Sequence, residues 1–141
     1  MSPADALLEI YRDVGESLAA LGYRCAACGQ CCDFDANDYE LYASGLEAEL
    51  VLGKTGRRPE LVGGRCCFQD ACGRCAIHEW RPLGCRTFFC QSASRGATAS
   101  RAAAADGSGF QALHEDALAR IRMMAEQSGE QWEYGPFFRN P

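Results

Sequence analysis

The sequence predicts a small single domain over residues 1–141, mostly α with irregular loops and built around a metal-crosslinked cysteine core. Three observations predict this fold class. Apolar residues recur at helical spacing near both ends of the chain. The middle is rich in Gly, Arg and Pro and has no long periodic stretch. Ten cysteines lie in two clusters between residues 25 and 90, where metal crosslinks can order a segment that buries little apolar surface.

An N-terminal helix is predicted over residues 2–21. Ser2 can cap it, and Pro3 suits its first turn. Gly22 follows as a stop signal. The residues that form its apolar stripe are Leu7, Leu8, Tyr11, Val14, Leu18 and Leu21. This helix is expected to pack over the cysteine region.

A second helix is predicted over residues 37–52, with Asn37 or Asp38 as its cap. Its buried stripe would be Leu41, Tyr42, Leu46 and Leu50. The segment 53–90 is predicted to form loops and very short strands. Together with the first cysteines it makes up a metal-binding core over residues 22–90, and removal of the metal should unfold this part of the chain.

Three further segments complete the chain. Residues 91–109 are rich in Ala, Ser and Gly and are predicted to form a flexible connector. A C-terminal helix is predicted over residues 110–128, because its apolar residues fall at helical spacing. The aromatic tail from residue 130 onward is expected to be extended and to pack across the core.

Charge and composition argue against two classes of partner, nucleic acids and membranes. The net charge is −5 and the pI is about 5.0, which argues against a nucleic-acid partner, since that usually requires a basic face. No run approaches the ~18 apolar residues of a membrane span. The N-terminal stretch carries acidic residues and lacks the apolar region of an export signal. We therefore expect a cytoplasmic protein that has no membrane partner and whose thiols stay reduced.

The cysteines form two blocks. The first has the spacing C-x2-C-x2-C-C and contains Cys25, Cys28, Cys31 and Cys32. The second contains Cys66, Cys67, Cys72, Cys75, Cys85 and Cys90. Clustering, the x2 spacing and the lack of an export signal all favour metal thiolates over disulfides. Zinc and iron–sulfur clusters both use such spacing, so the choice of metal stays open.

The adjacent pair Cys31 and Cys32 suggests more than one ion. Neighbouring side chains in extended backbone point to opposite sides, so two adjacent thiolates serve two ions more naturally than one. The alternative is that one of the two is a small buried apolar residue. We therefore expect two ions or one multinuclear cluster.

The chain resembles the YkgJ-like family of zinc- or iron-chelating cysteine-cluster proteins. The resemblance covers residues 22–90 and follows C-x2-C-x2-C-C, then C-x-F, then C-x-I-[YH]-x2-R-P-x2-C-R-x-F. The positions that match the last two elements are Cys66, Phe68, Cys75, Ile77, His78, Arg81, Pro82, Cys85, Arg86 and Phe88. Members are often labelled iron–sulfur oxidoreductases. The resemblance implies metal chelation and says little about a reaction.

The resemblance also implies a ligand set. The seven shared cysteines are Cys25, Cys28, Cys31, Cys32, Cys66, Cys75 and Cys85. The three additional cysteines, Cys67, Cys72 and Cys90, are candidates for further ligands that complete a site, for free thiols, or for the binding of a transferable ion. Two tetrahedral ions need eight ligand positions, which seven thiolates fill if one sulfur bridges or if His78 supplies the eighth.

The remaining candidate residues are two histidines, two arginines and one aspartate. His78 is a possible ligand, although the family usually has Tyr there, and packing is the alternative role. Arg81 and Arg86 could offset the thiolate charge or donate to sulfur. His114 is expected at the surface and Asp70 in a surface or capping role.

No catalytic arrangement is evident, so enzyme activity stays open. The predicted function is zinc or iron chelation, with an iron–sulfur redox protein as the alternative.

Overall fold

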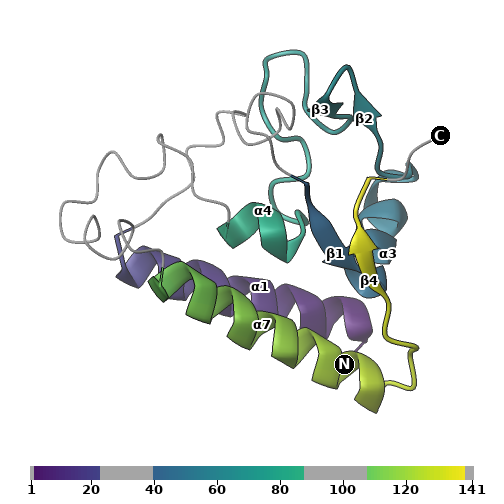
Figure 1. Cartoon of the computed structure of the whole chain (residues 1–141). Coiled ribbons are helices and arrows are strands. Elements are labelled where there is room, and N and C mark those ends of the chain that lie inside the picture. Colours follow the sequence, from purple (N-terminus) through teal and green to yellow (C-terminus); the bar gives the residue numbers. More distant parts are fainter. Residues whose placement is uncertain (1, 23–39, 88–107, 139–141) are drawn as a thin grey trace.

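The structure is a computed structural model that describes residues 2–22, 40–87 and 108–138. In chain order (Figure 1), its elements are α1 (Pro3–Ala20), β1 (Tyr42–Ser44), α3 (Gly45–Thr55), β2 (Leu61–Val62), β3 (Arg65–Cys66), α4 (Leu83–Thr87), α7 (Ser108–Gln127) and β4 (Tyr134–Pro136). The described part is mostly helical with two small two-stranded sheets. This confirms the predicted mostly α class.

The N-terminal helix forms where its caps predict it. The Ser2 side chain accepts a hydrogen bond from the backbone N–H of Asp5, and Pro3 occupies the first turn. Gly22 adopts a φ of 87°, a left-handed conformation that ends the helix. The buried residues of α1 are Leu7, Ile10, Tyr11, Val14 and Leu18. Of these, Ile10 lies outside the predicted stripe.

The second predicted helix is wrong at its start. Residues 42–44 form the strand β1, and α3 begins only at Gly45. The reason is a capping box: Ser44 accepts from the backbone of Glu47, while the Glu47 side chain accepts from the backbone of Ser44. As a result Tyr42 is exposed rather than buried, and Glu47 is completely buried. Gly56 ends the helix in the left-handed conformation.

Strand β1 pairs with the distant strand β4. The two are antiparallel, with Ala43 opposite Gly135 and Ser44 opposite Tyr134. A further backbone bond, from the N–H of Phe137 to the carbonyl of Leu41, extends the pairing. The aromatic tail therefore crosses the core as an extended segment, as the sequence predicts.

Strands β2 and β3 form a tight hairpin. Val62 pairs with Arg65, so only Gly63 and Gly64 make the turn. Their φ values of 60° and 79° are both positive, the combination that a two-residue type I′ turn requires. Within the described residues 53–87, the predicted short strands and loops are thus present, together with the one-turn helix α4 and the last residues of α3.

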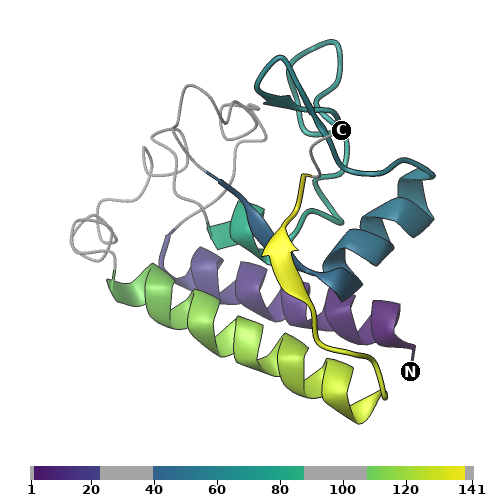
Figure 2. The ribbon, with the colours of Figure 1, turned by 45° about the vertical axis from the view of Figure 1, so that its right-hand side comes forward.

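The elements pack around two apolar cores. Figures 1 and 2 show α1 and α7 lying side by side, with α4 and the β1–β4 sheet over them and the β2–β3 hairpin on the opposite side of the molecule. The helix core joins α1, α3, α4 and α7 through Leu7, Ile10, Tyr11, Val14, Leu18, Leu50, Leu83, Ala117 and Ile121. The cysteine-side core consists of Leu41, Ala43, Val51, Cys66, Phe68, Ile77 and Phe137. Trp80 packs against both.

Several predictions made from sequence fall outside the described residues. These are the ligands Cys25, Cys28, Cys31 and Cys32, the additional Cys90, and the connector up to residue 107. Helix α7 begins at Ser108, two residues before the predicted start. Among the described helices, none has the combination of length and apolarity needed to cross a membrane.

Candidate metal centre

Three of the seven predicted ligand cysteines lie in the described part of the chain, all at the cysteine-side core. Cys66 is buried within this core, with 8% of its surface exposed. Cys75 and Cys85 are partly buried and pack against it, and so does the additional Cys67. Residues separated by up to 19 positions thus meet at one apolar cluster.

Cys72 differs from the other described cysteines. It is exposed and is not packed against either core. It lies in a loop that the Asp70 side chain closes by accepting from the backbone N–H groups of Cys72 and Arg74, both at 2.9 Å. This capping role is the one predicted for Asp70. The loop carries Cys72 outward while an antiparallel bridge pairs Cys75 with Gln69.

The backbone after Cys66 is arranged to stabilise a thiolate. The N–H of Phe68 donates to the Sγ of Cys66 at 3.4 Å, and the N–H of Gln69 donates to the Cys66 carbonyl. A hydrogen bond to the charged form of a group favours that form. The cysteine sulfurs at this core and the N–H contact to Cys66 therefore fit a soft metal ion held by thiolate sulfur.

Cys67 has a different environment from its neighbour. Burial is the main cause that raises the pKa of the Cys67 thiol. Its sulfur lies 4.0 Å from the carbonyl oxygen of Arg58. Cys67 thus favours the neutral thiol when no cation is present, which suits a small packed residue better than a reactive nucleophile.

Cys85 is fixed by the short helix α4. Pro82 precedes this helix and its carbonyl accepts from the N–H of Cys85 at 3.0 Å. At the first helical residue, the N–H of Leu83 donates to the carboxylate of Glu47 at 2.7 Å. The backbone around Cys85 is therefore held by bonds to another part of the fold.

Glu47 is a residue that the predicted site did not include. Its carboxylate is 0% exposed and accepts from Tyr11, Leu83 and Ser44. Burial and the neighbouring carboxylate raise the pKa of Tyr11, so its hydroxyl stays protonated and donates. The S-x-x-E pattern of residues 44–47 is the sequence signal that could have revealed this residue.

Arg86 is positioned by backbone carbonyls and an aromatic ring. Its Nε donates to the carbonyl of Arg81 at 2.9 Å and its Nη2 to that of Glu79 at 2.6 Å. The guanidinium lies 3.9 Å from the ring centre of Tyr11, which is close enough for a cation–π contact. Burial, with the nearby Arg81, lowers the pKa of Arg86 to about 10, so it remains charged at neutral pH.

His78 and Arg81 each carry a buried nitrogen. Among the described residues, the buried side-chain nitrogen and oxygen atoms that lack a hydrogen-bond partner are His78 Nε2 and Arg81 Nε. Burial, with the charges of Arg81 and Arg86, lowers the pKa of His78. The imidazole is therefore neutral near pH 7, the form in which histidine binds metals.

The described residues do not form a complete metal site by themselves. Within residues 2–22, 40–87 and 108–138, no three His, Cys, Asp or Glu side chains lie close enough to hold one ion. The three matching cysteines share a core but do not converge on a single point within this part of the chain.

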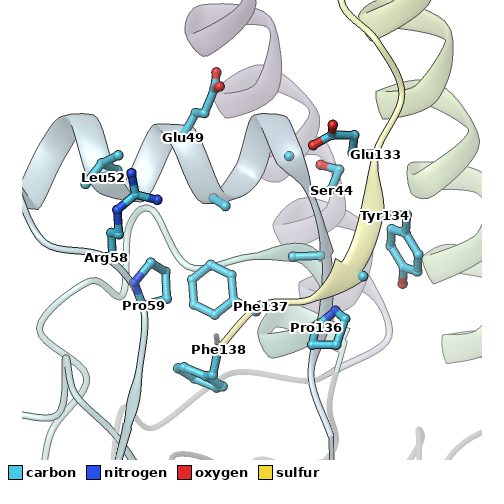
Figure 3. Close-up of a pocket in the computed structure, with 14 residues that line it drawn as sticks. Ser44, Glu49, Leu52, Arg58, Pro59, Glu133, Tyr134, Pro136, Phe137 and Phe138 are labelled. Carbon is cyan, nitrogen blue, oxygen red and sulfur yellow. The ribbon is translucent and has the colours of Figure 1, made fainter. Parts of the chain in front are cut away.

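The structure also has a groove whose lining contains none of these sulfurs. It has a volume of about 620 Å³ and runs between α3 and β4 (Figure 3). Its 14 lining residues include Arg58, Glu133 and Phe137 but no cysteine or histidine. The groove is therefore not the thiolate site.

The surface role predicted for His114 is wrong. This histidine, on α7, is half-buried and its Nδ1 lies 2.7 Å from the hydroxyl of Thr87. Thr87 also donates to the carbonyl of Leu83 at 3.1 Å. His114 thus links α7 to the end of α4, two residues after Cys85.

His114 should make stability depend on pH. Burial lowers its pKa below the ordinary value, against smaller raising effects of Glu47 and Glu115. A histidine with a lowered folded-state pKa resists protonation, so its contribution is present above about pH 6.5 and is lost as pH falls. The loss in unfolding free energy between about pH 7.5 and pH 5.5 should be smaller in His114→Gln than in the natural protein. Equal losses by denaturant titration would contradict this.

A family model matches residues 24–105 of the chain, a range that covers both cysteine blocks. Its description is CxxCxxCC, a "putative zinc- or iron-chelating domain". The chain belongs to this family. This confirms the family assignment made from the cysteine pattern. Comparisons with curated proteins and with solved structures give no match.

Proposed function

We propose that this CxxCxxCC-family chain binds two zinc or iron ions through thiolates from both cysteine blocks. The downstream ligands would be Cys66, Cys75 and Cys85, and the upstream ligands would be Cys25, Cys28, Cys31 and Cys32. The observation that carries the proposal is the gathering of Cys66, Cys75 and Cys85 at one apolar core. Because these three do not complete a site within the described residues, we assign the remaining ligands to the cysteines of residues 25–32.

The number of ions rests on ligand count and on the pair Cys31–Cys32. Seven thiolates nearly fill two tetrahedral shells. His78 is proposed as the eighth ligand, supported by its neutral imidazole and its buried Nε2 without a hydrogen-bond partner. A bridging sulfur would serve the same purpose, and would leave His78 in a packing role.

Charge compensation is assigned to the two motif arginines. Seven thiolates exceed the charge of two divalent ions, and a buried net charge is costly unless it is paired. Arg81 and Arg86 are proposed as the compensating groups. In support, Arg86 is charged, partly buried and adjacent in sequence to Cys85.

The alternative occupant is an iron–sulfur cluster, which would make the chain a redox protein. The same thiolates could hold either, provided the compartment keeps them reduced, as the cytoplasm does. Absorption near ~400 nm from protein purified without oxygen would identify the cluster, whereas zinc-loaded protein is colourless.

The experiment compares two cysteine variants of the full chain. Cys66→Ser removes a buried sulfur that accepts the Phe68 N–H, whereas Cys72→Ser changes an exposed residue away from both cores. We expect Cys66→Ser to lower the zinc and iron content by about one equivalent, since a tetrahedral site loses one of four ligands. Cys72→Ser should keep the full content.

Elemental analysis after purification under reducing conditions measures both variants. If Cys66→Ser retained as much metal as Cys72→Ser, the proposed ligand set would be wrong.

A further inference from the structure

We infer that Glu47, together with Tyr11, is a positioning residue that holds the Cys85 segment ready for metal. Neither residue belongs to the cysteine motif. The inference rests on the proposed function, because it assigns a role to Glu47 only if Cys85 binds the ion. Glu47 acts through α4 and touches no metal itself.

The carboxylate of Glu47 reaches across to α4. Its Oε1 accepts from the N–H of Leu83 at 2.7 Å and from the hydroxyl of Tyr11 at 2.9 Å. The first N–H groups of a helix have no acceptor within the helix. The Leu83 N–H therefore binds a fixed external acceptor, and Cys85 follows two residues later in the same five-residue helix.

The other oxygen locks the carboxylate in place. Oε2 accepts from both the N–H and the hydroxyl of Ser44, each at 2.9 Å. With four donors on two oxygens, the carboxylate has one orientation available. Helices α1, α3 and α4 are thus joined at one buried point, and α4 cannot turn without breaking the charge-assisted hydrogen bond from the Leu83 N–H.

The far side of Cys85 is held as well. Arg86 donates to the carbonyls of Glu79 and Arg81 and lies over the Tyr11 ring. Thr87 contacts His114 on α7. The backbone on both sides of Cys85 is therefore anchored by contacts that include no metal ion.

Such anchoring should raise metal affinity. A ligand that is already oriented loses less conformational freedom on binding. Groups that orient metal ligands typically change affinity by about 10- to 100-fold when mutated. Glu47 fits this role because it fixes the helix of a proposed ligand without being a ligand.

The alternative is that Glu47 only stabilises the fold. Val14→Ala provides the matched control, since Val14 is buried on the same helix as Tyr11 but takes no part in the hydrogen-bond network. It lowers stability by shortening a core side chain. A protein that remains folded at the assay temperature shows little change in affinity from a loss of stability alone.

The experiment is a competition titration with zinc on the reduced full chain. Glu47→Gln replaces one acceptor oxygen by a donor amide and should weaken zinc binding by about 10- to 100-fold. Tyr11→Phe keeps the ring under Arg86 but removes one donor, and should weaken binding by a smaller factor. Val14→Ala should stay within about twofold of the natural chain.

The outcomes distinguish a positioning role of Glu47 from a role in fold stability alone. If the natural chain binds no zinc in this titration and elemental analysis finds no iron in it, the proposed function fails. If it binds zinc and the Glu47 and Tyr11 variants match Val14→Ala, the positioning role is overturned. Should Glu47→Gln not fold, Tyr11→Phe decides alone: weaker binding than Val14→Ala supports the role, and equal binding refutes it. Cobalt absorption of each variant then reports whether a thiolate has been lost from the ion.

Discussion

Glu47→Ala is expected to lower the unfolding free energy by about 3–5 kcal/mol. The substitution leaves the Tyr11 hydroxyl, the Leu83 N–H and two groups of Ser44 without their acceptor in a buried region. Each unsatisfied buried donor costs about 1–3 kcal/mol, and water entering the new cavity offsets part of the sum. Denaturant unfolding followed by circular dichroism measures the loss.

Glu49→Ala is the matched control for this prediction. Glu49 lies on the same helix two residues away but is exposed. Its removal should change stability by no more than about 0.5 kcal/mol, as is usual for surface positions. Equal unfolding free energies for the two variants would show that the buried carboxylate does not join the helices as described.

Metal removal is expected to loosen residues 61–78 and to leave the helix core folded. The sequence predicts that all of residues 22–90 depend on metal for their folding. The contacts in the structure limit this expectation to a shorter segment. Residues 82–87 are anchored by Glu47 and by α7, whereas the hairpin exposes Leu61 and Val62 and contributes Cys66 to the cysteine-side core. The free energy of metal binding is therefore expected to stabilise chiefly the hairpin and the loop that follows it.

Hydrogen exchange before and after chelation measures this difference. Backbone amides such as those of Cys67 and Ala76, which are hydrogen-bonded in the structure, should lose most of their protection. Amides in the middle of α1 and α7 should keep theirs. Unchanged exchange and unchanged circular dichroism after complete metal removal would contradict the metal-crosslinked core.

The parts of the fold that local signals determine could be predicted from the sequence. Ser2 and Pro3 specify the start of α1, and its apolar spacing specifies the buried face. The start of α3 could have been found from the Ser44–Glu47 capping box. Instead, the apolar residues Leu41 and Tyr42 suggested an earlier helix, although Leu41 is buried beside a strand and not on a helix.

Long-range features could not be predicted in this way. The pairing of β1 with β4 joins residues about 90 positions apart, and no local pattern specifies such a partner. The burial of Glu47 depends on donors from three separate elements, whereas an isolated glutamate is normally expected at the surface. The contact between His114 and Thr87 was missed for the same reason.

The cysteine motif shows both what the sequence can predict and what it cannot. Spacing alone predicts thiolate chelation, and the family match supports zinc or iron. Spacing does not show that Cys67 shares the apolar core while Cys72 faces solvent, because that depends on the loop closed by Asp70. The structure thus separates additional cysteines that the sequence treats alike.

The metal content of the reduced, fully loaded natural chain tests the central claim most directly. Elemental analysis should find about two equivalents of zinc or iron per chain, as two nearly complete tetrahedral shells require. A value near one would contradict the two-ion proposal alone. A value near zero would contradict chelation by the two cysteine blocks.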